Sequence, residues 1–354
     1  MRALWIVTAG IEKLASCADP ERQILACRIA SARMRTGVAA LEWKRAGNEN
    51  VFWCPSAAGA DHKVDWASTG VCIVPKFYFD APLQPWYEAC LAARNNGCPL
   101  VIDITDYPFA SEYEVVPAFY SGVLPICDAV VVNSERMAEL IAPHAPHRPL
   151  VIDDAILGAA RNPEFAPAGR LRLLWIGHGT NLRYLNEHLD ALLRFALQKP
   201  CRLTVVTDGG SGAQEAAQRI DARCAPALEA RFIEWSLEAM ASALRRCDLL
   251  LIPSDPSDPF KAGVSANRIA EALRAGRFPV ASPLPSYLAF SDSGWLGRDL
   301  TEGIRWALAN PGEVRARIRR GQALVSEKFA PEKIGQQWRT LLESLVPGKP
   351  NPGR

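Results

Sequence analysis

The sequence predicts an α/β protein with two doubly wound domains, and three observations lead to this prediction. Short runs of valine, isoleucine and leucine alternate with segments of helical periodicity, as in parallel sheets covered on both faces. The chain has 354 residues, enough for two domains of about 150 residues each. The alternation stops at 153–170, a stretch rich in alanine, proline and glycine, and then restarts. We therefore expect domains at 1–152 and 171–346, a linker between them, and a disordered tail at 347–354.

The first half contains buried-type strands, most of them followed by a helix. Gly97 before Pro99 supplies a helix stop, and Ser134 is a good N-cap for the segment that follows it. On this pattern we expect strands at 2–8, 70–76, 99–104 and 128–133, and helices at 20–36, 85–97 and 134–144.

The second half repeats the pattern and predicts a second open sheet. Leu182, Leu185 and Leu189 share one stripe of a helical segment, which is the spacing of an amphipathic helix. The expected strands are 170–178, 201–208, 230–235, 247–254 and 277–282, and the expected helices are 181–199, 213–223, 236–246, 265–275, 311–328 and 331–345.

Composition excludes several classes of function. The net charge is +2, so the whole chain carries no electrostatic footprint for nucleic acid. No apolar run approaches the ~18 residues of a membrane span, and the apolar run at the start is too short for a secretory signal. The ten cysteines form no C-x-x-C pair and no zinc-ligand spacing with histidine. We expect a cytoplasmic protein without disulfides or metal, and peripheral membrane contact stays open.

The loop "IGHGTN", 176–181, follows the first strand of the second domain. In doubly wound sheets, ligands bind beyond the carboxyl ends of the strands. Gly177 and Gly179 free the backbone for close approach to an anion. A dinucleotide fingerprint would need a third glycine where Leu182 stands, so a phosphate loop of another kind is favoured over NAD binding. His178 is either a ligand donor or a turn residue.

The loop "SDPSDPFKAGVSANR", 254–268, carries more chemical content. Lys261 can reach a phosphate, and Ser265 is a good N-cap for the next helix. Arg268 in the first helical turn opposes the helix dipole unless an anion binds there, and Glu271 one turn on can accept hydrogen bonds from a diol. This pattern favours a nucleoside diphosphate. The simpler alternative is a solvated helix start with a local Arg268–Glu271 pair.

Residues 247–282, "CDLLLIPSDPSDPFKAGVSANRIAEALRAGRFPVAS", resemble the C-terminal signature of GT-B glycosyltransferases of the family 4 type, which retain the anomeric configuration and use nucleotide-sugars. Weaker matches lie at 101–109, 127–141, 173–181 and 329–338. The resemblance implies two Rossmann-like domains facing across a cleft, with the C-terminal helix packing back. It also implies sugar transfer from a nucleotide-sugar donor to a hydroxyl of a glycan, lipid-linked or small-molecule acceptor, as in polysaccharide biosynthesis.

The resemblance also assigns roles to residues of the second domain. Glu271 would hold the ribose hydroxyls, Arg268 would contact the diphosphate or the sugar, and Trp235 would lie near the base or else pack in the core. Lys261 would stabilise the departing diphosphate, so that no metal is needed. The expected donor site comprises Gly177, His178, Gly179, Asn181, Trp235, Ser254, Ser265, Asn267, Arg268 and Glu271.

The sequence departs from the family at one position. The family pattern has two glutamates with seven residues between them, and Gly263 stands where the first would be. Asp258 is the nearest acid, displaced by an apparent insertion. The departure leaves open whether the reaction retains or inverts the anomeric centre. It also favours one alternative, a nucleotide-binding scaffold of glycan assembly that has lost catalysis.

The first domain should then hold the acceptor. Lys76, Asp103 and Asp106 follow or end predicted strands, and the loop at 8–16 joins them at the same edge. Asp103 or Asp106 could deprotonate an acceptor hydroxyl in an inverting reaction. Asp103 could equally be a buried cap of its strand. The predicted catalytic residues are therefore Asp103, Asp106 and Lys261, and a nucleotide-sugar epimerase or a phosphorylase with a pyridoxal lysine are the other enzymatic alternatives.

Overall fold

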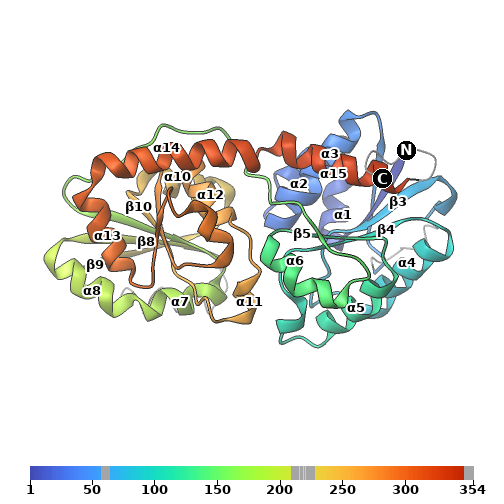
Figure 1. Ribbon diagram of the computed structural model, residues 1–354, viewed down its shortest axis with the longest axis horizontal. Helices are drawn as coiled ribbons and strands as arrows, with labels where there is room; N and C mark the ends of the chain where they lie inside the picture. Colours follow the sequence, from blue (N-terminus) through green and yellow to red (C-terminus); the bar gives the residue numbers. More distant parts are fainter. Residues whose placement is uncertain (57–63, 209–214, 216–217, 219, 221–227, 347–354) are drawn as a thin grey trace. The chain divides into compact units, whose positions relative to one another are not determined.

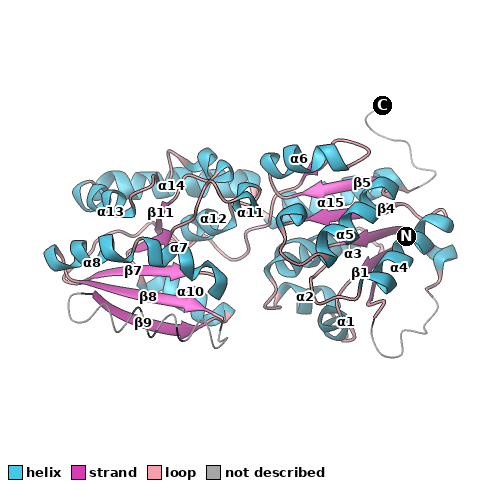
Figure 2. Cartoon of the chain, turned by 90° about the horizontal axis from the view of Figure 1, so that it is seen from below, coloured by secondary structure: helices cyan, strands magenta, loops and turns pink. Residues whose placement is uncertain are grey.

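The computed structural model describes the chain except residues 57–63, 209–214, 216–217, 219, 221–227 and 347–354 (Figures 1 and 2). It divides into two compact units, each with a six-stranded parallel sheet among its described residues, which confirms the α/β prediction. The first unit comprises Met1–Ala155, Ala262–Ser265 and the chain from Lys328, and the second comprises Ile156–Lys261 and Ala266–Glu327. The expected tail at 347–354 and most of the expected helix at 213–223 lie outside the described residues.

The sheet of the first unit has the order β2-β1-β3-β4-β5-β6. Every neighbouring pair is parallel. The strand order reverses between β1 and β3, so their carboxyl ends form the switch point where ligands bind in such sheets. The strands are β1 (Arg2–Ile6), β2 (Glu49–Trp53), β3 (Thr69–Val74), β4 (Leu100–Ile104), β5 (Ala129–Val132) and β6 (Leu150–Val151).

Helices cover both faces of this sheet, with α3 and α15 on one side and α4 and α5 on the other (Figure 1). The prediction of one helix at 20–36 is wrong. The structure has a short helix, α2, that ends at Leu25, and a separate π-helical turn, η1, that leads into α3. Ser134 caps α6 as predicted, its Oγ accepting from the N–H of Met137 at 3.1 Å. The helices are α1 (Ala9–Ala15), α2 (Pro20–Leu25), η1 (Ala32–Thr36), α3 (Gly37–Arg45), α4 (Leu83–Asn95), α5 (Val115–Val123), α6 (Glu135–Ile141) and α15 (Pro331–Leu345), with short 3₁₀ turns η2 (Trp66–Ser68), η3 (Pro108–Ala110), η4 (Leu124–Ile126) and η5 (Ala142–His144).

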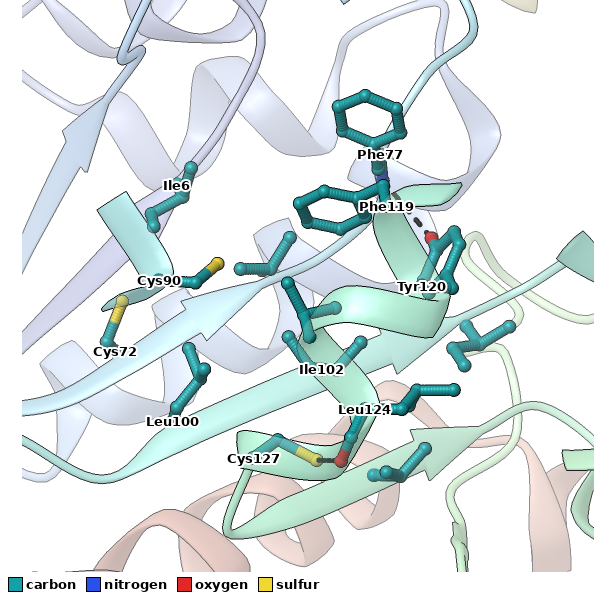
Figure 3. Close-up of a cluster of buried hydrophobic side chains, with 14 of the residues drawn as sticks. Ile6, Cys72, Phe77, Cys90, Leu100, Ile102, Phe119, Tyr120, Leu124 and Cys127 are labelled. Carbon is teal, nitrogen blue, oxygen red and sulfur yellow. Dashed lines mark hydrogen bonds between the residues drawn. The ribbon is translucent and has the colours of Figure 1, made fainter. Parts of the chain in front are cut away.

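Aliphatic side chains, together with aromatic rings and cysteines, fill the core between this sheet and the helices α4 and α5 (Figure 3). The ring of Phe77 stacks on that of Phe119 with centroids 4.1 Å apart, and Trp86 meets Phe77 edge-on at 5.5 Å. The hydroxyl of Tyr120 accepts from the backbone N–H of Phe77 at 3.2 Å. Burying each such ring contributes about 1.5–3 kcal/mol. The thiols act as small apolar groups, and burial raises the pKa of Cys90 to about 12.

The C-terminal helix α15 packs back on α3 of the first unit, as predicted. A Cβ on Gly335 would lie 2.9 Å from the Cβ of Glu42, so the two helices touch closely there. Arg339 Nη1 donates to Glu42 Oε1 at 2.9 Å, and Trp338 is buried. The chain from Lys328 therefore groups with the first unit, whereas the sequence placed it in the second domain.

The sheet of the second unit has the order β12-β11-β10-β7-β8-β9, all parallel. Counted from β7, this order is 3-2-1-4-5-6, the arrangement of dinucleotide-binding folds, with its switch point between β7 and β10. The strands are β7 (Leu171–Ile176), β8 (Cys201–Thr207), β9 (Leu228–Glu234), β10 (Leu249–Ile252), β11 (Phe278–Ala281) and β12 (Trp295–Leu296).

Helices α7 and α8 lie on one side of this sheet, and α10 and α12 on the other (Figure 1). The helix expected at 181–199 is divided at His188. Part of the expected linker packs here: Gly276, at φ 72°, leaves room for the carbonyl of Asn162, and Phe165 is buried. The helices are η6 (Gly179–Asn181), α7 (Leu182–Glu187), α8 (Leu189–Gln198), α10 (Leu237–Arg246), α11 (Pro259–Ala262), α12 (Asn267–Arg274), η7 (Pro285–Phe290), α13 (Leu300–Ala309) and α14 (Pro311–Lys328).

Candidate functional site

Two loops leave the switch point of the second unit, one after β7 and one after β10. Because β7 and β10 are hydrogen-bonded neighbours, with Leu251 opposite Trp175, their carboxyl ends lie side by side. The loop after β7 holds the glycine pair, and the loop after β10 runs through α11 to the start of α12. The fold thus brings together the two segments that the sequence selected separately as phosphate-binding.

Gly177 and Arg268 meet at this edge. A Cβ on Gly177 would lie 2.8 Å from the indole ring of Trp175 and 3.1 Å from Nη1 of Arg268. The missing side chain therefore lets the guanidinium group approach the loop. Arg268 projects from the first turn of α12, whose opposite face buries Ile269 and Leu273.

The start of α12 has no side-chain cap, which corrects the role predicted for Ser265. The N-cap position is Ala266, whose side chain cannot accept a hydrogen bond. Ser265 is buried, and its Oγ donates to Oδ2 of Asp154 at 2.6 Å, so its hydroxyl is already used in the first unit. The N-cap residue therefore supplies no acceptor to the first amides of α12. Amides at a helix start are groups to which an anion can bind. Asn267, Arg268 and Glu271 are half-buried around this helix start.

The amides of the two glycines in the loop after β7 take part in hydrogen bonds within the second unit. The N–H of Gly177 donates to the carbonyl of Val206 at 3.1 Å, and that of Gly179 donates to Oδ1 of Asp208 at 2.5 Å. His178 acts as a turn residue, because its Nδ1 accepts from the N–H of Thr180. Burial favours a higher pKa for Asp208, but the hydrogen bond from Gly179 contributes to a net lowering of the pKa. The contribution of this loop to the candidate site is therefore the space that Gly177 leaves for Arg268 at the carboxyl edge of the sheet.

Lys261 and Asn181 also come together. Nζ of Lys261 donates to Oδ1 of Asn181 at 2.8 Å, and the same ammonium lies 5.0 Å from the ring centroid of Phe260. Lys261 is half-buried at the end of α11. The hydrogen bond from Lys261 to Asn181 thus joins the loop after β10 to the loop after β7 and fixes the position of a positive charge there.

Asp258, the displaced acid, has its carboxylate occupied. Its Oδ2 accepts from Nη2 of Arg183 at 2.9 Å and from the hydroxyl of Tyr184, and its Oδ1 accepts from the N–H of Phe260 at 2.8 Å. Burial and the hydrogen bond to Asp258 raise the pKa of Tyr184 to about 12. This carboxylate therefore anchors α11 to α7, a role that the sequence did not predict.

Trp235 and Ser254 lie at the same sheet edge but in separate places. Trp235 follows β9, which is two strands from β7. At the spacing of neighbouring strands, the ends of β9 and β7 are about 10 Å apart. Its N–H donates to the carbonyl of Thr207 at 2.7 Å, and its side chain is half-buried. The N–H of Ser254 donates to Oγ of Ser282 at 2.9 Å, which ties the end of β10 to that of β11.

In the first unit, Asp103 has the structural role that its strand-end position also allowed. It is 1 % exposed, and its carboxylate accepts from Nε and Nη2 of Arg35 at 2.8 and 2.6 Å. Arg35 also donates to Asp154 at 3.0 Å and to the carbonyl of Ile152 at 2.7 Å. Burial raises the pKa of Asp103, opposed by the Arg35 guanidinium. A buried carboxylate held in this way is poorly placed to reach an acceptor hydroxyl, so its predicted catalytic role has no support in this geometry.

Asp106 is the accessible carboxylate of the pair. Its Oδ2 lies 2.5 Å from Nζ of Lys76, and the side chains are 38 and 25 % exposed, respectively. Although burial opposes it, the Asp106 carboxylate raises the pKa of Lys76. The ring of Tyr78 lies 5.2 Å from the same ammonium. Two of the residues predicted to face an acceptor are therefore brought together.

The space at Gly263 is filled from α6. A Cβ there would lie 2.6 Å from Cε of Met137 and 3.4 Å from Cδ1 of Leu140. The carbonyl of Gly263 accepts from Oγ of Ser134 at 2.9 Å. The missing glutamate of the family pattern thus corresponds to a packed position, where an acidic side chain would require Met137 to move.

Two general features of the described residues bear on the site. Within the parts of the chain that the structure covers, no three histidine, cysteine, aspartate or glutamate side chains lie close enough together to hold a metal ion. Among the same residues, none of the helices has the length and apolar character needed to cross a membrane.

Comparisons with known proteins give similarity at the level of structure. No protein-family model matches the chain, and a search of curated proteins finds no match. HepE from Anabaena, solved with UDP-glucose, is 14 % identical with a TM-score of 0.68 over 97 % of this chain and 100 % of HepE. A glycosyltransferase from Rickettsia africae is 10 % identical with a TM-score of 0.68 over 98 % of this chain and 99 % of that chain. The UDP-forming α,α-trehalose-phosphate synthase of Burkholderia xenovorans is 13 % identical with a TM-score of 0.55 over 78 and 74 % of the two chains. These similarities confirm the predicted GT-B fold class.

Proposed function

We propose that this protein transfers a sugar from a nucleoside-diphosphate sugar to a hydroxyl acceptor. The observation that carries the proposal is the approach of Arg268 to Gly177 beside the uncapped start of α12, at the switch point of the second sheet. A cation and a helix start without a side-chain cap together favour a bound diphosphate. Glu271, one turn along α12, would accept hydrogen bonds from the ribose diol.

The departing diphosphate gains negative charge as the glycosidic bond breaks. Lys261, which is hydrogen-bonded to Asn181, and Arg268, which approaches Gly177, would stabilise that charge. Such a contribution is large in a site from which water is excluded. With two cations available, we propose that no divalent metal is required. Activity that is lost on EDTA treatment and restored by Mg²⁺ would contradict this part of the proposal.

The donor proposed is a uridine diphosphate sugar, because structural neighbours such as HepE were solved with UDP or UDP-glucose. The acceptor is proposed to be a glycan, a lipid-linked sugar or a small molecule, in a pathway of polysaccharide assembly on the cytoplasmic side of the cell. Asp106 is the proposed base if the reaction inverts the anomeric centre, since it is the accessible carboxylate of the pair. Proton NMR of the product distinguishes inversion from retention.

Calorimetric titration with UDP, GDP and their sugars tests the donor site. The parent is expected to bind one of these nucleotides, and Arg268→Ala and Glu271→Ala are each expected to weaken binding at least 10-fold. Arg194→Ala, which removes an exposed arginine from α8, is the matched control and should bind as the parent does. Equal binding by all four proteins would overturn the proposed site.

A second candidate is a nucleotide-binding scaffold without turnover, and the packing at Gly263 favours it. Met137 occupies the position from which the family pattern would present an acid. Tight nucleotide binding without hydrolysis of the donor or transfer to any acceptor would support the scaffold over the enzyme.

A further inference from the structure

Two aromatic side chains of the first unit are stacked on each other and still largely exposed. The rings of Phe79 and Tyr113 lie with centroids 4.3 Å apart and planes 18° apart. Phe79 is 54 % exposed and Tyr113 is 47 % exposed. Neither belongs to the buried cluster that contains Phe77 and Phe119, so core packing does not account for them. We call this pair the aromatic platform.

The aromatic platform stands on two loops that follow neighbouring strands. Phe79 lies between β3 and α4, and Tyr113 lies between β4 and α5. The same two loops meet a second time, where Lys76 pairs with Asp106 at 2.5 Å. The platform is therefore at the carboxyl edge of the sheet, joined through its own loops to the polar pair predicted to face an acceptor.

The residues beside the two rings are acidic. Asp80 follows Phe79, and Glu112 and Glu114 flank Tyr113, and all three are exposed. Anionic lipid headgroups and nucleic acid would be repelled by this charge, because such surfaces are attracted to clusters of lysine and arginine. A neutral ligand rich in hydroxyl groups would instead find carboxylate acceptors around an apolar ring surface.

We propose that the aromatic platform binds a neutral sugar ring of the acceptor. One face of a pyranose presents C–H bonds, which suit the electron-rich face of an aromatic ring, while its hydroxyls can donate to Asp80, Glu112 or Glu114. The proposal rests on the proposed function, since it names the class of acceptor for that reaction. It favours a neutral saccharide over an anionic lipid headgroup as the group held next to Lys76 and Asp106.

Saturation-transfer NMR on the full chain tests the platform directly. The probes are maltotriose, cellotriose, mannotriose and tri-N-acetylchitotriose, each at millimolar concentration. At least one is expected to show saturation transfer with the parent, reduced at least five-fold in the Phe79→Ala/Tyr113→Ala protein. Leu288→Ala, which removes an exposed apolar side chain from the second unit, should give the parent signal. Phe79→Leu/Tyr113→Leu keeps apolar bulk without the rings and should also lose the signal.

Two further measurements separate this proposal from the others. If none of the four saccharides binds the parent, or if binding survives in both double variants, the platform is not a sugar site. Sedimentation with phosphatidylcholine–phosphatidylglycerol vesicles that is lost in the double variants would assign it to a membrane surface and overturn the proposal. Calorimetry with UDP reports on the donor site independently: saccharide binding without UDP binding would contradict the proposed function while leaving the platform in place.

Discussion

Arg268 approaches Gly177 so closely that a Cβ added to the glycine would lie 3.1 Å from Nη1 of the arginine. These residues are far apart in the sequence, and they meet because β7 and β10 are adjacent in the sheet. The N–H groups of Gly177 and Gly179 donate hydrogen bonds to Val206 and Asp208. Gly177 therefore contributes to this edge through the space it leaves for the guanidinium group of Arg268. The proposed donor site would therefore depend on a steric relationship as much as on charge.

Gly177→Ala is expected to weaken nucleotide binding at least 10-fold and to lower stability. The new methyl would press on Trp175 and Arg268, and overpacking of this kind costs about 1–3 kcal/mol. Calorimetry with UDP and urea unfolding measure the two effects. Gly312→Ala is the control, because a Cβ there would meet nothing within 4 Å. A Gly177→Ala protein with the parent's affinity would show that Arg268 does not need this space.

Hydrophobic runs and loop chemistry were enough to predict the parallel sheets and the cap at Ser134. They also selected the loops of Gly177 and Arg268, but separately, and the approach of the two residues comes from the pairing of β7 with β10. The missed strands carry weaker patterns: β2 is half-polar, with Glu49 and Asn50, and β6 and β12 each have two residues. Their pairing comes from neighbouring strands rather than from their own propensity.

The sequence could not predict which side chains form hydrogen bonds or ion pairs with each other. Ser265 had the right type and place for a cap, but the buried Asp154 takes its hydroxyl. Asp103 looked equally suited to a site or a strand end, and only the position of Arg35 decides between them. Arg35 itself lay within a helical pattern that gave no sign of the π-turn burying it. Such contacts depend on tertiary positions that no local pattern reports.

Asp103→Asn is expected to destabilise the first unit by about 3–5 kcal/mol, because it leaves the guanidinium of Arg35 buried without its main counter-charge. Urea unfolding measures this loss. Glu139→Gln breaks the exposed pair with Arg136 and should cost under about 1 kcal/mol. A stable Asp103→Asn protein that binds UDP and has lost turnover would instead make Asp103 a catalytic base.

Asp153 is expected to make stability fall between about pH 4 and pH 7. Burial and the neighbouring Asp154 raise its pKa from 3.8 to about 6 in the folded protein. A raised carboxyl pKa means that the folded state binds its proton more tightly than the unfolded state. The folded state is therefore favoured at low pH, and that stability is lost as pH rises through 6.

Asp153→Asn removes this titration and should raise the free energy of unfolding at pH 8, relative to the parent, by up to about 3 kcal/mol. The difference between the two proteins should be small at pH 4. Urea unfolding at a series of pH values measures it. Asp292→Asn, at an exposed acid of the second unit, is the control. Parallel pH profiles for the parent and Asp153→Asn would show that Asp153 titrates normally.

Gly263 and Met137 should be coupled in a double-mutant cycle. Gly263→Ala introduces a Cβ 2.6 Å from Cε of Met137 and should cost about 1–3 kcal/mol. Met137→Ala leaves a cavity in a buried position and should cost about 2–5 kcal/mol. In the double variant the new methyl enters space that Met137 has vacated, so the combined loss should fall at least 1 kcal/mol short of the sum. Urea unfolding of the four proteins gives the coupling, and simple additivity would mean that Met137 moves aside freely and leaves room at Gly263 for a larger side chain.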